Sequence, residues 1–514
     1  MTRDDVPGPA WLRGRDVAMA IFKYLSRKLR HLLMALTYGL LGLLVGGVII
    51  FIVHMESRPD LSPWHTAILD HEFTASREAE VGDLNGYLAL EETLFAQLHG
   101  QVVDKVPDAG SPRQRINRYA AGSQANPLAF DANWNRTFEL DSAEPRAAFL
   151  MLHGLSDSPY SMRALAEDLH ARGASVVGLR LPGHGTAPTA LARVDWRDFT
   201  AAVRLAMRSM RRDLPPGVPL FMVGYSNGAA LAVEYTLQAL ERQDLPLPAG
   251  LVLMSPALAV SPTAGLARWN LLLGRLAGLQ KLAWLSIQPE FDPYKYNSFP
   301  VNAGEQIHRL TSEIAGSLQR LDTGRGVPGF PPIVAFQSAV DATILADGVV
   351  RDLLVHLTPN QHELVLFDIN RQAETNAFFA TDPHDAVEQL FSAARPFDLR
   401  LVTNRGTDSA ALMERLRAQG ASEISERKLE LAWPQGIFSL SHVALPFRPD
   451  DPIYGVAPHL DGHLPSLGTV DLRGETGVLQ VPLSQFLRLR YNPFYDYLLE
   501  RVTERFLPAD STVP

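Results

Sequence analysis

The sequence contains no cysteine in 514 residues. That absence excludes structural disulfides, thiolate zinc sites and a thiol nucleophile. An excess of positive charge is also missing, because 47 Lys and Arg stand against 56 Asp and Glu, a formal net charge of −9. Since phosphate binding needs concentrated positive charge, we expect no nucleic-acid partner.

Motifs for metals and nucleotides are missing as well. The histidines show no H-E-x-x-H spacing, and the glycines form neither a G-x-G-x-x-G fingerprint nor a phosphate loop ending in Gly-Lys-Ser/Thr. We therefore expect no metal and no nucleotide cofactor. What the chain does have is length and 46% hydrophobic residues, enough to bury a full-sized core.

An uncharged apolar run occupies residues 32–53. Its length matches the ~20 apolar residues that a helix needs to cross a bilayer. Residues 1–31 carry seven basic and three acidic side chains, which by the positive-inside rule predicts a cytoplasmic N-terminus and an extracytoplasmic remainder. A buried core helix is usually shorter or carries a polar stripe, and a cleaved signal peptide has a shorter apolar core. We expect an uncleaved signal anchor that holds the chain in the membrane.

The remainder divides into a lead-in and a main domain. Residues 54–140 form an extramembrane lead-in with an amphipathic helix at 77–100, expected to pack on the main domain or to space it from the bilayer. Residues 141–505 alternate apolar runs with helical periods, which predicts an α/β fold with a mostly parallel sheet covered by helices on both faces. The expected strands are 147–152, 174–179, 220–223, 250–254 and 332–336, and the expected helices are about 161–172, 195–212 and 227–241.

Residues 261–330 interrupt this alternation with aromatic residues and helical leucines. An insertion at this point of a parallel sheet is expected to lie over the carboxyl ends of the strands, where ligands bind.

Gly224-Tyr225-Ser226-Asn227-Gly228 matches the pattern G-x-S-x-G. The pattern alone is weak, but here it stands directly between a predicted strand and a predicted helix. A serine on such a sharp turn has its Oγ above the sheet edge, and the helix N-terminus behind it favours developing negative charge. The alternative is an ordinary glycine-flanked turn. We predict that Ser226 is a nucleophile.

A loop that can help this nucleophile follows the first predicted strand, as His153-Gly154-Leu155. An oxyanion hole needs two backbone N–H groups aimed at the developing charge. The N–H groups of Leu155 and Asn227 are the candidates. His153 itself can be explained simply as a hydrogen-bonded turn residue, and we do not expect it to be the base.

Three stretches together carry a resemblance to a known family: His153-Gly154 with Ser158-Pro159-Tyr160-Ser161-Met162, Leu181-Pro182-Gly183-His184-Gly185-Thr186, and Gly224 to Gly228. They resemble the monoacylglycerol-lipase-like branch of the α/β hydrolases, which also includes lysophospholipases and serine aminopeptidases. The resemblance is specific over about 145–260 and looser over 330–450. It implies an α/β-hydrolase fold, a carboxylic-ester hydrolase, and an insertion that serves as a helical cap over an acyl site.

In this fold the acid and the base follow the nucleophile in that order. Asp341 comes just after the strand at 332–336, where the acid of the family lies, although a helix N-cap is the alternative explanation for an Asp there. Asp368, at the end of a similar apolar run, is the second candidate.

The base is assigned by position among six downstream histidines. His442 lies in a loop-like stretch after the apolar run 429–432, where the histidine of the family would lie. The link from Asp341 is about 100 residues, longer than usual, so an additional strand–helix excursion at roughly 363–425 is required. His459 and His463 remain the main alternatives, while His356, His362 and His384 fall in predicted helices or at a strand start.

These predictions combine into a membrane-anchored serine hydrolase with the triad Ser226, His442 and Asp341 and with a hydrophobic or lipid-derived ester as substrate. An amide or peptide substrate is the second possibility, because the same triad cleaves both bonds. A catalytically inactive binding or scaffolding protein on the same fold is the third. The sequence does not predict the oligomeric state.

Overall fold

A computed structural model of the chain describes residues 10–111, 114–258, 279–339, 346–372, 383–456 and 487–507. The chain divides into two compact units, Met1–Asp60 and Leu61–Pro514.

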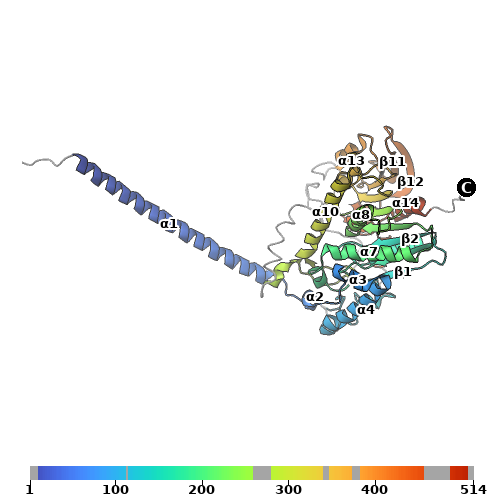
Figure 1. Cartoon of the computed structure of the whole chain (residues 1–514), viewed down its shortest axis with the longest axis horizontal. Coiled ribbons are helices and arrows are strands. Elements are labelled where there is room, and N and C mark those ends of the chain that lie inside the picture. The colour runs from blue at the N-terminus through green and yellow to red at the C-terminus, as the bar shows by residue number, and fades with distance from the viewer. Residues whose placement is uncertain are drawn as a thin grey trace, which may run out of the picture. The chain divides into compact units, whose positions relative to one another are not determined.

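The first unit is one long helix, α1 (Ala10–Ser57) (Figure 1). The stretch Phe22–Ser57 is long and apolar enough to cross a membrane. This stretch contains no proline, and its first acidic residue is Glu56. The helical backbone hydrogen bonds therefore continue from the basic segment through the apolar run without a break. Helix α1 therefore includes all of residues 32–53. Its orientation in a membrane stays a prediction.

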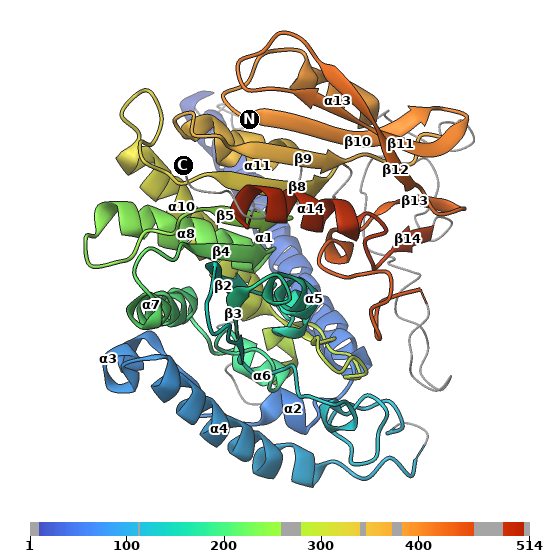
Figure 2. The ribbon, with the colours of Figure 1, turned by 90° about the vertical axis from the view of Figure 1, so that its right-hand side faces the viewer.

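The second unit is built on a ten-stranded sheet in the order β1-β3-β2-β4-β5-β8-β9-β10-β11-β12 (Figure 2). The pairs from β3 to β10 are parallel, whereas β1, β11 and β12 are antiparallel to their neighbours. The strands are β1 (Phe138–Leu140), β2 (Ala147–Leu152), β3 (Ala174–Leu179), β4 (Leu220–Tyr225), β5 (Leu251–Met254), β8 (Ile333–Ser338), β9 (Glu363–Phe367), β10 (Asp398–Gly406), β11 (Ser409–Arg417) and β12 (Ser425–Ala432). The mostly parallel sheet that the sequence predicts is confirmed.

Helices cover both faces of this sheet. One layer packs on one face and contains α4 (Leu84–Gln101), α7 (Trp196–Asp213), α8 (Asn227–Glu241), α10 (Val301–Leu321), α11 (Ala346–Asp352) and α13 (Pro383–Phe391). The other face is covered by α5 (Tyr160–His170) and α14 (Tyr495–Phe506), which lie in front of the sheet in Figure 2.

The alternation of side chains along each strand explains why both faces are apolar. In β2, Leu150 and Leu152 belong to the core under α7 and α8, whereas Phe149 and Met151 belong to the core under α5 and α14. All four are fully buried. Because successive side chains of a strand point to opposite faces, a strand covered on both sides reads as a continuous apolar run. This is why the sequence reveals the parallel strands well.

The lead-in packs on the main domain around Arg180, which is 1% exposed. The guanidinium of Arg180 donates to both carboxylate oxygens of Glu72, at 2.9 and 3.1 Å, and to Glu91 on α4 at 3.1 Å. The Tyr87 hydroxyl adds a bond of 2.7 Å to the Arg180 carbonyl oxygen. Separating a buried charge from two carboxylate partners is costly. From Leu61 onward, the lead-in is accordingly part of the second compact unit.

The structure differs from the sequence prediction in three places. The helix expected at 77–100 is divided into α3 (Glu78–Val81) and α4, because Gly82 has a φ of +78° and Asp83 caps the second helix by accepting from the N–H of Gly86. The excursion expected at 363–425 contains β9, α13, β10 and β11, and among these strands only β11 runs antiparallel to both its neighbours. Within the range 261–330, α10 packs along α8 in the covering layer.

Candidate active site

Ser226 lies between the end of β4 and the start of α8, in a backbone conformation that only a tight turn imposes. Its φ of 53° and ψ of −113° lie outside the regions that L residues ordinarily adopt. Four backbone hydrogen bonds hold it there. Its N–H donates to the Met254 carbonyl at 2.8 Å, and its carbonyl oxygen accepts from Ala229 and Ala257 at 3.1 Å and from Ala230 at 3.2 Å. Such strain is kept where the surrounding structure fixes it, and it is common at functional sites.

The two glycines of the motif are required by close packing. A Cβ atom at Gly228 would lie 2.1 Å from the carbonyl oxygen of Leu152, and one at Gly224 would lie 2.4 Å from the Cα of Ala229. These neighbours are backbone atoms, which cannot move aside cheaply. The spacing G-x-S-x-G is therefore explained by the approach of α8 to β2 and β4.

The loop after β2 lies beside this turn, because β2 and β4 are adjacent and parallel, with Leu152 in register with Gly224. The loop continues as His153-Gly154-Leu155-Ser156, and Ser156 also has a positive φ of 63°. Asn227 is the first residue of α8, so its N–H has no acceptor within the helix. The two predicted oxyanion residues, Leu155 and Asn227, thus come from neighbouring segments at the same sheet edge.

His153 has a structural hydrogen-bonding role. Its Nε2 accepts from the N–H of Leu181 at 3.0 Å, so Nδ1 carries the proton and donates to the Gly154 carbonyl at 2.9 Å. Burial lowers the pKa of His153 well below its ordinary value, and the neighbouring His184 acts in the same direction. A neutral His153 ties the loop after β2 to the loop after β3. The expectation that it is not the base agrees with these contacts.

His442 opens a short helical turn after β13 (Ile437–Leu440). Two hydrogen bonds fix β13 at the sheet edge: the N–H of Asn370, just after β9, donates to Phe438 at 2.8 Å, and the Ser338 hydroxyl at the end of β8 donates to the Leu440 carbonyl at 3.1 Å. The chain returns after β12 to the ends of β8 and β9. His442 therefore follows a segment that lies at the carboxyl ends of β8 and β9. This is the edge of the sheet at which Ser226 follows β4, despite the intervening strands.

Asp341 lies outside the described residues, as do His459 and His463. Described residues end at Ala339 on this side, one residue after β8. The second acid candidate, Asp368, is 1% exposed and already engaged by Arg371 and Thr403. Its oxygens accept from Arg371 Nε at 2.5 Å, from Nη2 at 2.8 Å and from the Thr403 hydroxyl at 2.6 Å. Asp368 is thus a partner in a buried ion pair.

A group that the sequence analysis did not single out lies in the same loop. Asp157 is buried and accepts from Lys295 Nζ at 2.8 Å. Burial raises the pKa of Asp157, while Lys295 and, more weakly, His442 act in the opposite direction. The N–H of Tyr296 also donates to the Ser156 carbonyl at 2.8 Å. No local pattern links residues about 140 positions apart, so this contact between segments had no signal in the sequence.

Comparisons with known proteins agree with this geometry. Residues 143–319 match the family model "Serine aminopeptidase, S33". Over 197 residues the chain is 26% identical to a monoglyceride lipase homolog of Monkeypox virus, covering 35% of this chain and 68% of that protein. Over 192 residues it is 27% identical to a thermostable monoacylglycerol lipase of Bacillus sp. (strain H-257), covering 35% and 71%.

Among solved structures, the monoacylglycerol lipase of Paleococcus ferrophilus matches with 21% identity and a TM-score of 0.34, over 45% of this chain and 88% of that one. The family match, the two relatives and the parallel sheet with its serine turn agree with one another. The chain has an α/β-hydrolase fold, and it is similar to the monoacylglycerol-lipase-like branch of these proteins, which supports a carboxylic-ester hydrolase.

Proposed function

We propose that this chain is a membrane-anchored serine hydrolase that cleaves hydrophobic or lipid-derived carboxylic esters through Ser226. The observation that carries the proposal is the strained turn at Ser226, between β4 and α8, in a family whose relatives include a monoacylglycerol lipase. A sharp turn of this kind presents a serine Oγ above the sheet edge and in front of a helix N-terminus.

The reaction that we propose has two acyl-transfer steps. His442 takes the proton of Ser226 as Oγ attacks the ester carbonyl, and the N–H groups of Leu155 and Asn227 stabilise the oxyanion. His442 then gives the proton to the departing alcohol. A water molecule hydrolyses the acyl-enzyme by the same route and releases the carboxylic acid and Ser226. Asp341 orients the imidazole and stabilises its cation.

The location of β13 supports His442 in this role. Asn370 and Ser338 hold β13 at the ends of β9 and β8, where the base of this fold is found. His442 also acts weakly on the pKa of Asp157, which lies in the same loop as Leu155. The engagement of Asp368 by Arg371 and Thr403 leaves Asp341 as the better acid candidate.

The apolar helix and the insertion point to the substrate class. Helix α1 includes Phe22–Ser57, which is apolar enough to cross a membrane, and we propose an uncleaved anchor with a cytoplasmic N-terminus. The proposed cap is restricted to 261–300, because α10 begins at Val301 and packs along α8. Such a cap at a membrane surface fits an acyl chain better than a polar substrate.

Ser226→Ala tests the nucleophile. We expect hydrolysis of p-nitrophenyl butyrate to fall by several orders of magnitude, and labelling by a fluorophosphonate probe to disappear, with the unfolding temperature unchanged. Ser312→Ala, on the exposed side of α10, is the matched control and should retain both. Wild-type protein that is folded but takes no label would favour the scaffolding alternative. Hydrolysis by Ser226→Ala at the wild-type rate would contradict the proposal.

Two further measurements test the substrate and the anchor. Turnover of a monoacylglycerol, a lysophospholipid and an aminoacyl arylamide separates ester from amide specificity, which the name of the matched family leaves open. We expect the monoacylglycerol to be preferred.

The anchor is tested by the intact mass of the protein. A mass that includes residues 1–57, in protein that resists alkaline extraction from membranes, identifies an anchor. A mass that begins beyond the apolar run identifies a cleaved signal peptide.

A further inference from the structure

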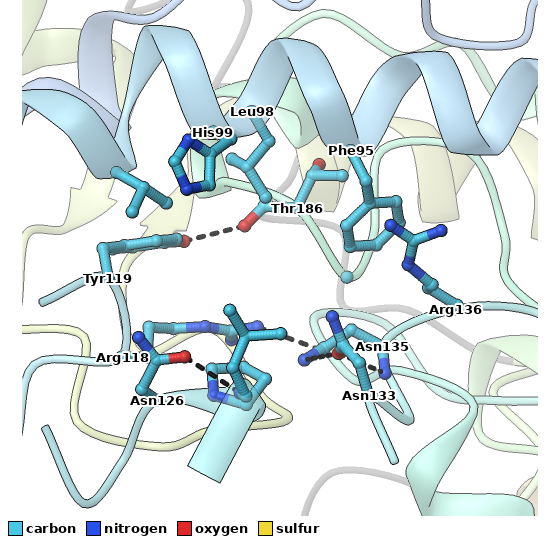
Figure 3. Close-up of a pocket in the computed structure, with 14 residues that line it drawn as sticks. Phe95, Leu98, His99, Arg118, Tyr119, Asn126, Asn133, Asn135, Arg136 and Thr186 are labelled. Carbon is cyan, nitrogen blue, oxygen red and sulfur yellow. Dashed lines mark hydrogen bonds between the residues drawn. The ribbon is translucent and has the colours of Figure 1, made fainter. Parts of the chain in front are cut away.

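A small pocket lies away from Ser226, between helix α4 of the lead-in, the turns at 118–136 and the loop at 185–186 (Figure 3). It encloses about 130 Å³. Its apolar lining includes Phe95 and Leu98 of α4 and Leu128 of the turn at 127–129. Three basic residues, Arg118, Arg136 and His99, also line it, and no Asp or Glu is among the described residues of its lining. Arg136 is paired with Glu92 and His99 contacts Asp104 at 3.2 Å, so the positive charge that favours an anion in this pocket is that of Arg118.

Arg118 is the decisive residue, because its guanidinium is buried and makes no ion pair with a carboxylate within the described part of the chain. Only 2% of the residue is exposed. Its Nη2 donates to Asn135 Oδ1 at 2.9 Å and its Nη1 to the Lys295 carbonyl at 3.3 Å, while its Nε has no partner within the described part of the chain. The guanidinium carbon lies 5.6 and 5.5 Å from the ring centres of Tyr119 and Tyr296. Figure 3 shows Arg118 on the side of the pocket opposite α4.

The nearby carboxylate of Glu290 does not contact the Arg118 guanidinium directly. It accepts from the N–H groups of Asn297 and Ser298 at 3.0 and 2.8 Å, and Arg118 acts on its pKa only through a longer-range electrostatic interaction. The second arginine of the pocket, Arg136, is paired with Glu92 at the surface. A buried guanidinium without a carboxylate in contact is costly, and a bound anion would reduce that cost.

We propose that this pocket binds a free short-chain carboxylate, with its charge against Arg118 and its hydrocarbon part against Phe95, Leu98 and Leu128. An apolar cavity of roughly 150 Å³ accepts a molecule the size of benzene, so about six to eight non-hydrogen atoms fit here. Charge-assisted hydrogen bonds to a guanidinium fix a carboxylate in orientation, which a neutral molecule of the same shape cannot reproduce. This binding does not depend on the hydrolysis proposed for Ser226.

The test uses the full chain in lipid nanodiscs, with Ser226→Ala to exclude turnover, in a ligand-detected NMR titration at pH 7.5. Hexanoate should bind, whereas its neutral analogue hexanamide and the short anion acetate should each bind at least about tenfold more weakly. Empty nanodiscs give the background of membrane partitioning. Absence of hexanoate binding, or equal affinity for hexanamide or acetate, would overturn the proposal.

Variants then locate the site. Arg118→Gln should weaken hexanoate binding at least about tenfold while leaving weak hexanamide binding unchanged. Leu128 is 73% exposed at the rim, so Leu128→Asp should fold normally and repel the anion even if Arg118→Gln does not fold. The matched control Leu247→Asp changes an exposed leucine outside the pocket and should have no effect. Wild-type hexanoate affinity in Leu128→Asp would place the binding site elsewhere.

Discussion

The hydroxyl of Ser338 donates a hydrogen bond of 3.1 Å to the carbonyl oxygen of Leu440, 102 residues further along the chain. Ser338 ends β8 and Leu440 ends β13, so this bond joins the two segments that lead into Asp341 and His442. The long link between the proposed acid and the proposed base thus runs through β9 to β12 and returns to the end of β8. Ser338 and Leu440, 102 residues apart in the sequence, meet at this bond.

The first prediction concerns the proposed base, His442. His442→Gln should lower kcat/KM for p-nitrophenyl butyrate by several orders of magnitude, because no other group would remove the proton of Ser226. His459→Gln and His463→Gln are the matched controls and should stay close to wild type. A large loss in either control, with His442→Gln active, would move the base to that histidine.

The two acid candidates make the second prediction. Asp341→Asn should lower kcat by about 10⁴-fold with little change in stability, because the histidine loses its orienting carboxylate. Asp368→Asn should instead reduce the free energy of unfolding by about 3 kcal/mol, since the buried Asp368 would lose its charge and with it the ion pair with Arg371. Initial rates and urea denaturation of both variants separate the roles. The reverse pattern would exchange the two assignments.

Packing at the serine turn makes the third prediction. Gly228→Ala should abolish activity and lower the unfolding temperature, because the new Cβ would lie 2.1 Å from the Leu152 carbonyl oxygen and 2.7 Å from that of His153. Gly304→Ala, in the middle of α10, meets no atom within 4 Å and should stabilise the protein by up to about 1 kcal/mol. An active, stable Gly228→Ala would mean that α8 does not approach β2 this closely.

Glu234 makes a prediction about pH. Burial in α8 raises its pKa from 4.5 to about 7, and one of its carboxylate oxygens has no partner among the described residues. The folded state therefore holds a proton that the unfolded state releases. The associated stability is fully present below about pH 4.5 and is lost as the pH rises through 7.

The measurement compares the free energy of unfolding at pH 5 and pH 8. In the wild-type protein the free energy of unfolding should fall by up to ~3 kcal/mol from pH 5 to pH 8. Glu234→Gln should not show this fall, because its side chain stays neutral. Glu500→Gln, exposed on α14, should keep the wild-type pH dependence. If the two variants respond alike, Glu234 is not protonated in the folded protein.

Regular elements of the main domain were predictable because their signals are local. The residues 147–152 and 174–179 form β2 and β3 as expected, since a strand buried on both faces must be apolar throughout. The helix expected at 227–241 is α8, which begins directly after Ser226. The lead-in was less predictable, because Gly82 divides its helix through a backbone conformation that periodicity does not show.

The sequence by itself determined the parallel sheet, the turn that presents Ser226 and the apolar helix near the N-terminus, since each depends on residues adjacent in the chain. Only the tertiary structure decided which groups from distant segments meet. It brings Glu72 and Glu91 of the lead-in onto Arg180, joins Asp368 to Thr403, and returns β13 to the end of β8. Burial makes such pairs strong, and burial is a property of the whole fold that no local pattern contains.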